Sequence, residues 1–243
     1  MWPFKSNKII FKHKIELIRK LYPIYSAVKM NLQWRAKIIK HVKANNFSSN
    51  SALCDGIRVL MSSSYVVTSP VDIQITTNGD GHTFNWKIPS ADISNQLDNK
   101  FVSFFDPETY GNHVELPSNT LRTIIKIDTG WLVSAPKEYN LIVTPLCYNE
   151  ENRFTALLGI QDLTISHEIN IPLQWHVLND TTIIKSGTPL ALLNLVPKNR
   201  FNYKITAPTV KDEELRARLG MATSISFSKP ASQIIREFYK NKV

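Results

Sequence analysis

Short runs of β-branched and aromatic residues recur about every ten positions between residues 64 and 197, with proline or glycine between them. Examples are "SYVVT" (64–68), "VDIQITT" (71–77) and "TTIIK" (181–185), which have the length of strands. The stretch "NGDG" (78–81) supplies Asn-Gly and Asp-Gly, which tolerate positive φ and predict a hairpin between the runs around it. At least seven such strands predict a mainly β barrel or sandwich.

The segments on either side of this β region have a different pattern. Apolar residues at four-residue spacing within 32–46 predict a short amphipathic helix. Near the C-terminus, 209–220 predicts a helix that stops at Gly220, and 229–243 predicts a second helix. We therefore expect three parts: a basic N-terminal extension over 1–51, a β-barrel or β-clip core over 52–197 and a helical C-terminal tail over 198–243.

The positive charge is concentrated at the start of the chain. The 243 residues carry a net charge of +9, and residues 1–50 hold eleven Lys and Arg residues but a single acid, Glu16. This asymmetry predicts an arm over 1–44 that faces nucleic acid or an acidic protein surface, and the alternative is a solvated extension. The candidate contact residues lie in the expected helix, which could instead dock on the β core: Trp34, Arg35, Lys37, Lys40 and Lys43.

Cysteine and hydropathy exclude several classes of protein. Cys54 and Cys147 are far apart in sequence and form no CxxC pair, so neither a disulfide framework nor a zinc ribbon is expected. No apolar run approaches the roughly 20 residues of a membrane span, and the basic N-terminus lacks the apolar core of a secretory signal. We expect no membrane segment and a reducing compartment.

Three motifs, in order, resemble the dUTPase and dCTP deaminase superfamily, which has a β-clip fold. They are "IKIDTGWLVSAPKEYNLIVTP" (125–145), "LLGIQD" (157–162) and "IIKSGTPLALLNLV" (183–196). Gly159 and Asp162 match the family's glycine-aliphatic-aliphatic-aspartate motif, and Gly187 matches the glycine of its closing strand. The segments "CDGI" (54–57) and "TTNGDGHTFNW" (76–86) resemble a family of tailed-bacteriophage proteins. The resemblance implies a dUTPase-like β-clip, with a jelly-roll-like barrel as the alternative.

The same resemblance supplies the candidate site. Asp162 is the candidate catalytic residue, and a pocket around it would bind a ligand through Asp128, Tyr139, Gly159, Asp162 and Gly187. Asp128 belongs to "DTG", a motif also found in aspartic proteases, but a turn-stabilising aspartate is the simpler interpretation.

The catalytic motifs are degenerate. Ile165 stands where the family has a sugar-stacking tyrosine, and Thr188 stands where it has an aspartate. Residues 144–148 lack the family's phosphate-gripping arginine, and Arg153 is the nearest one. A triphosphate needs several charge-assisted donors and Mg²⁺, so the resemblance implies that the sheet is kept and the pyrophosphatase chemistry is lost.

The six histidines do not have the clustered spacing of metal ligands, so no metal site is predicted. We expect no cofactor, with Mg²⁺ needed only if the protein processes nucleotides.

These observations favour a phage-encoded protein that is not an enzyme and acts in binding or in structure and assembly. The alternative is a nucleotide-binding or nucleotide-processing protein with a remodelled pocket. The resemblance implies a homo-oligomer, with a trimer as the natural form, located in the host cytoplasm or in the virion.

Overall fold

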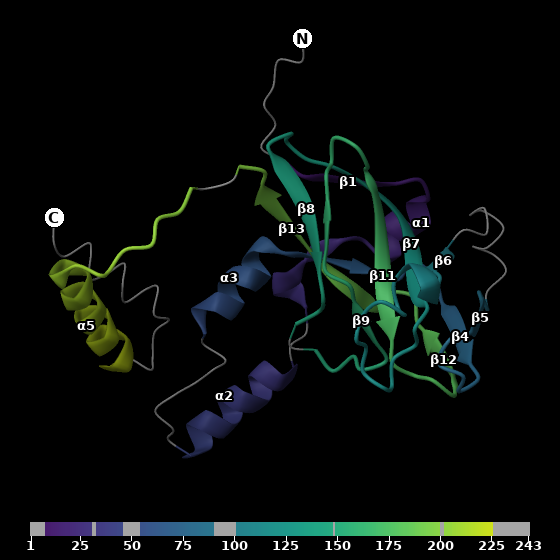
Figure 1. The fold of residues 1–243 in the computed structure, drawn as a ribbon, viewed down its shortest axis with the longest axis horizontal. Helices are drawn as coiled ribbons and strands as arrows, with labels where there is room; N and C mark the ends of the chain where they lie inside the picture. Colours follow the sequence, from purple (N-terminus) through teal and green to yellow (C-terminus); the bar gives the residue numbers. More distant parts are fainter. Residues whose placement is uncertain are drawn as a thin grey trace, which may run out of the picture. The chain divides into compact units, whose positions relative to one another are not determined.

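The computed structural model describes residues 8–30, 33–45, 54–89, 101–147, 149–199 and 202–225. The chain divides into two compact units, and Figure 1 draws its described helices and strands as ribbons. The first unit, Met1–Lys29 with Ser64–Lys198, contains every described strand, and the second is Met30–Ser63 with Asn199–Val243. The described helices of the second unit are α2 (Gln33–Asn45), α3 (Asp55–Ser63) and α5 (Val210–Ile225).

Sheet A is built around the longest strand, β7. Its five antiparallel strands are β1 (Ile10–His13), β6 (Val102–Phe105), β7 (Ile124–Ser134), β9 (Phe154–Ala156) and β11 (Glu168–Trp175). Two strands pair with the same edge of β7, one after the other. Strand β6 pairs with the first half of β7 and β1 pairs with the second half. Strand β11 pairs with the other edge of β7, and β9 pairs with β11. Alternate residues of β7 from Ile125 to Val133 are buried, as a half-buried strand requires.

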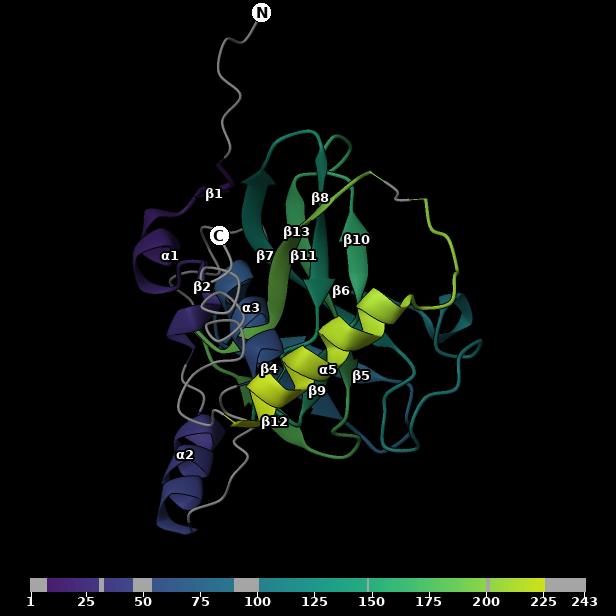
Figure 2. The ribbon, with the colours of Figure 1, turned by 90° about the vertical axis from the view of Figure 1, so that its left-hand side faces the viewer.

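Sheet B has the strand order β10-β8-β13-β3-β2. Its strands are β2 (Tyr25–Ser26), β3 (Tyr65–Thr68), β8 (Tyr139–Thr144), β10 (Gly159–Gln161) and β13 (Pro189–Pro197). Leu190 to Leu193 of the central strand β13 are all fully buried, so both faces of the strand are covered along this stretch. The edge strand β10 pairs only with β8 among the described residues (Figure 2).

Sheet C contains the hairpin predicted from "NGDG". It has three strands, β4 (Ile73–Thr77), β5 (Phe84–Lys87) and β12 (Thr181–Ile184). Gly79 and Gly81 have φ of 86° and 73°, and the Asp80 carboxylate accepts hydrogen bonds from the N–H groups of His82 and Thr83. The predicted turn chemistry therefore closes the β4–β5 hairpin.

The hydrophobic core of the first unit takes residues from all three sheets. Trp175 is fully buried and stacks on Phe154, with ring centroids 6.3 Å apart. Ile18 of the short helix α1 (Glu16–Leu21) is also fully buried in this core. Two short 3₁₀ turns complete the unit, η1 (Ala27–Lys29) and η3 (Pro107–Thr109).

The mainly β fold predicted from the sequence is confirmed, but the described strands form three open sheets and no closed barrel. The three-part division at 51 and 197 stays a prediction. Two segments of the expected N-terminal extension are strands of the first unit: β1 pairs with β7, and β2 pairs with β3. Phe11 of β1 packs edge-on against Tyr65 of β3, with ring centroids 5.3 Å apart.

Two helices differ from expectation. Helix α3 was not predicted, and α5 continues through Gly220 to Ile225 instead of stopping there. A glycine inside a helix costs only about 1 kcal/mol relative to alanine, so it does not force a stop. The start of α5 is fixed by a reciprocal cap. The Asp212 carboxylate accepts from the N–H and hydroxyl of Thr209, and the N–H of Asp212 donates to that hydroxyl. The second helix predicted over 229–243 lies outside the described residues.

Candidate functional site

Asp162 follows strand β10 and is held by two neighbours. Its Oδ1 accepts hydrogen bonds from the N–H and the hydroxyl of Thr164, at 2.9 and 2.7 Å. The Lys198 ammonium lies 2.5 Å from the same oxygen. The Lys198 ammonium, then Thr164, hold the pKa of Asp162 at about 2, well below its usual value. The carboxylate therefore links the β10–β11 connection to the residue that follows β13.

Tyr139 lies at the same end of sheet B as Asp162. It is the first residue of β8 and pairs with Pro197, while the N–H of Lys198 donates to the carbonyl of Glu138. On the other side of β8, Gln161 pairs with Leu141. The order of strands therefore brings Tyr139, Asp162 and Lys198 to one sheet end.

Gly159 is an exposed residue of β10, and a Cβ added to it would meet no atom within 4 Å. Its apolar neighbours are also exposed: Leu158 is 67% exposed, Ile160 65% and Ile165 83%. Ile165, which replaces the family's tyrosine, therefore offers an aliphatic side chain to solvent.

Gly187 lies at the opposite end of β13. Its φ is 81°, its N–H donates to the carbonyl of Ser69, and a Cβ added to it would lie 3.1 Å from the ring of Tyr22. The nine residues of β13 separate it from Lys198, a distance of roughly 30 Å along the strand. Gly187 and the Asp162–Lys198 pair therefore lie at opposite ends of β13.

Asp128 lies on sheet A, where the "DTG" residues form an irregularity in β7. Its Oδ1 accepts from the N–H of Gly130 at 3.0 Å, and the buried Thr129 hydroxyl donates to the carbonyl of Ile169 at 2.6 Å. Gly130 has a φ of 67°, and the register between β7 and β11 shifts here. The aspartate stabilises this local turn, as the simpler sequence interpretation expects.

His13 packs against this irregularity and was not singled out from the sequence. The ring is 5% exposed and makes an edge contact with Trp131, with centroids 5.1 Å apart. Its Nδ1 accepts from the N–H of Ile15, and a Cβ on Gly130 would lie 2.6 Å from its Nε2. Burial lowers the pKa of His13, and nearby backbone groups and Asp128 oppose that shift.

The five predicted contact residues of the basic arm lie on α2. Trp34 and Arg35 are half-buried, and Lys37, Lys40 and Lys43 are exposed. At 100° per residue these lysines follow one side of the helix.

Two further expectations concern arginine and metal ligands. Arg153 pairs with Glu151 through two N–O contacts of 2.8 and 2.6 Å, and donates to the carbonyl of Ile183. Its guanidinium is therefore already engaged inside the protein. No group of three metal-ligating side chains occurs within the described part of the chain.

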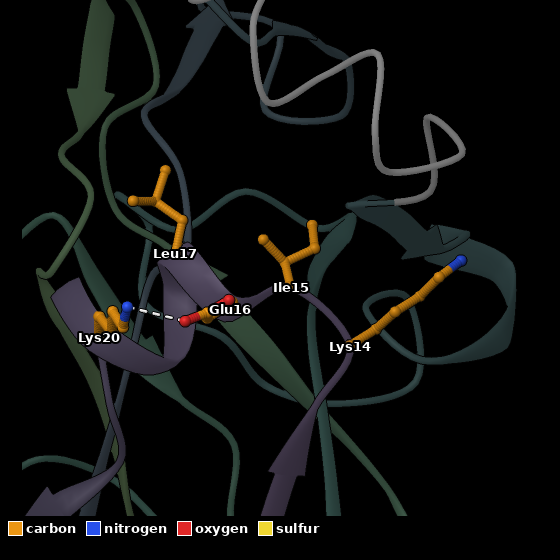
Figure 3. Close-up of a pocket in the computed structure, with 5 residues that line it drawn as sticks. All are labelled: Lys14, Ile15, Glu16, Leu17 and Lys20. Atoms are coloured by element: carbon orange, nitrogen blue, oxygen red, sulfur yellow. Dashed lines mark ion pairs between the residues drawn. The ribbon is translucent and has the colours of Figure 1, made fainter.

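Two hollows lie away from Asp162. One, of about 550 Å³, is lined by Lys14, Ile15, Glu16, Leu17 and Lys20 (Figure 3). The other, of about 450 Å³, is lined by His82, Asp106, Pro107, Glu108, Thr109 and Asn112.

No protein-family model and no curated protein matches the chain. None of the described helices is long and apolar enough to cross a membrane.

Among solved structures, the chain is similar to dUTPases of staphylococcal phages. A mutant dUTPase from phage phi11 of S. aureus shares 13% identity at a TM-score of 0.34, covering 61% of this chain and 85% of that one. The dUTPase of Staphylococcus bacteriophage 80alpha shares 12% identity at a TM-score of 0.33, covering 60% of this chain and 84% of that one. Phage dUTPases are thus among the solved structures to which the chain is similar, as the resemblance of its motifs predicts.

Proposed function

We propose that this protein is a phage-encoded, non-catalytic binding or assembly protein built on a dUTPase-like β scaffold. The observation that carries the proposal is the engagement of Asp162 by Lys198, at 2.5 Å, and by Thr164. A carboxylate whose pKa is about 2 is a poor proton acceptor at neutral pH, because a general base works best with a pKa near the working pH.

The other groups that a nucleotide pyrophosphatase needs do not converge on Asp162. Arg153 is paired with Glu151, and Gly187 lies at the far end of β13. Asp128 uses its carboxylate to bind the N–H of Gly130 in sheet A. The groups that bind a triphosphate must lie around one place to be effective, and Arg153, Gly187 and Asp128 lie in different parts of the fold.

The binding surfaces in this proposal are the edge strand β10 and the basic N-terminal segment. Leu158, Ile160 and Ile165 are exposed around an edge strand without lysine or proline, a pattern that favours association of copies. A homo-oligomer, with a trimer as its natural form, is part of the proposal. The basic residues of 1–44 would face a negatively charged partner in the host cytoplasm or in the virion.

A second candidate is a nucleotide-binding protein with a remodelled pocket. It is favoured by the position of Tyr139, which is 36% exposed at the same sheet end as Asp162 and could stack on a base. A panel of nucleotides in thermal denaturation separates the two candidates, because a ligand that prefers the native state raises the melting temperature. We expect no shift with any nucleotide.

The proposal is tested by incubating the full chain with dUTP and Mg²⁺ and measuring pyrophosphate. We expect release no faster than with buffer alone. Turnover that disappears in Asp162→Asn, while Asp72→Asn keeps it, would overturn the proposal. Asp72 is a suitable control because it is also paired with a lysine, Lys185 at 2.8 Å, but outside the candidate site.

A further inference from the structure

We propose that the β1–α1 corner, residues 8–20 of the first unit, binds single-stranded nucleic acid. This inference rests on the proposed function, because it identifies the negatively charged partner that the proposed binding protein would contact. It also moves the contact from α2, where the sequence predicts it, to a segment that is part of a sheet.

The first observation is a row of exposed lysines on and beside β1. Lys8, Lys12 and Lys14 are exposed, while Phe11 and His13 between them face the protein. Lys12 lies within β1, Lys8 precedes the strand and Lys14 follows it, so their positive charges gather on one short stretch of the surface.

These lysines are available to a ligand. Within the described part of the chain, no acid lies within ion-pair distance of Lys8, Lys12 or Lys14. On the same face, Glu168 pairs with Leu132 from the far side and is two strands from Lys12, about 10 Å away. The outer edge of β1 has no partner strand among the described residues, so its backbone N–H groups add donors beside the lysines.

The second observation is the hollow of about 550 Å³ that begins where the lysine row ends. In Figure 3, Lys14 and Lys20 stand on opposite sides of it, with the apolar side chains of Ile15 and Leu17 between them. Leu17 is 48% exposed. A single strand can place an unstacked base on this apolar surface while its phosphates follow the lysines, whereas bases in a duplex stay stacked and inaccessible.

Lys20 can also turn to a phosphate. It pairs with Glu16 at 2.7 Å, but the two side chains are 71% and 67% exposed. Exposed pairs of this kind contribute little, so exchange of Glu16 for a phosphate is inexpensive. The point charge of lysine suits phosphate, whereas bidentate recognition of carboxylates on an acidic protein favours arginine.

The corner is held in one geometry before any ligand arrives. Four residues of β1 pair with β7, and His13 packs on Trp131. The Arg19 guanidinium donates to the carbonyls of His13 and Lys14, which fixes the turn between β1 and α1. A preformed surface avoids most of the cost of ordering its side chains and backbone on binding.

The experiment measures binding of the full chain to a fluorescent 20-nucleotide single strand of mixed sequence, by anisotropy between 50 and 200 mM salt. Each phosphate contact on a single strand contributes about 0.7 to the slope of log K against log salt. The double variant Lys12→Ala/Lys14→Ala should therefore lower the slope by about 1.4, so that the affinity loss over this range becomes about 7-fold smaller than in the wild type.

The matched control is Lys87→Ala/Lys137→Ala, which removes the same charge from exposed positions of the same unit and should leave the slope unchanged. Equal slopes for the wild type and Lys12→Ala/Lys14→Ala, with both proteins melting alike, would overturn the inference. So would a slope that falls instead in Lys40→Ala/Lys43→Ala on α2.

The same strand in duplex form and a polyglutamate of equal length identify the partner. Weaker binding of both is expected, and equal or tighter binding of either would reject the single-stranded ligand. The result is independent of the pyrophosphate assay. Equal salt slopes for the wild type and Lys12→Ala/Lys14→Ala, together with no dUTP turnover, would reject the inference and leave the non-catalytic proposal standing.

Discussion

Replacing Gly130 by alanine should destabilise the first unit through two separable effects. The first is conformational, because Gly130 has a φ of 67°, which costs an L-residue about 1 kcal/mol or somewhat more. The second is steric, because the new Cβ would lie 2.6 Å from Nε2 of His13. His13 is buried against Trp131 and cannot move aside freely, so overpacking adds about 1–3 kcal/mol. We expect a total loss of about 2–4 kcal/mol in the free energy of unfolding.

A double-mutant cycle with His13→Ala separates these effects. In the His13→Ala background the obstacle is gone, so Gly130→Ala should cost only the conformational part, about 1 kcal/mol. Urea denaturation of the four proteins, followed by tryptophan fluorescence, gives the coupling free energy. A coupling near zero would refute the packing of β1 on the β7 irregularity, and with it the preformed corner.

Three further predictions concern the first unit. Gly111→Ala should destabilise it by roughly 3 kcal/mol or more in urea denaturation, because the added Cβ would lie 2.0 Å from the carbonyl oxygen of Arg122, which is backbone and cannot turn away. Lys198→Met should raise the pKa of Asp162 from about 2 towards its usual value, as measured by NMR titration of its carboxyl carbon; an unchanged pKa would contradict the ion pair. The pKa of His13 is lower in the folded than in the unfolded protein, so its contribution to stability is present above pH 6.5 and is lost as the pH falls through the folded pKa. When the pH is lowered from 7.5 to 5, the melting temperature should therefore fall less in His13→Leu than in the wild type.

Strands with a complete local signal were predictable from the sequence. "SYVVT" and "VDIQITT" correspond to β3 and β4, and "NGDG" closes the hairpin to β5, because period-two alternation and turn residues are contained in the runs themselves. Helix α3 was missed because its nine residues follow a polar stretch and carry no strong boundary signal.

Contacts between distant parts of the sequence could not be predicted. The partner of β1 in sheet A lies about 120 residues further along the chain, so nothing near His13 indicates that it is buried on Trp131. Lys198 lies 36 residues after Asp162 and just beyond the expected end of the core. The sequence therefore identified the aspartate but not the ammonium group that pairs with it and lowers its pKa.

The divided edge of β7 has a consequence for the newly made chain. Strand β1 leaves the ribosome long before β7 exists, whereas β6, which pairs with the first half of the same edge, precedes β7 by only about twenty residues. Closing so long a loop is slow, so β1 is expected to dock among the last elements. Until then its lysines belong to an unfolded segment. The corner that we propose as a nucleic acid surface therefore forms only when β1 has paired with β7.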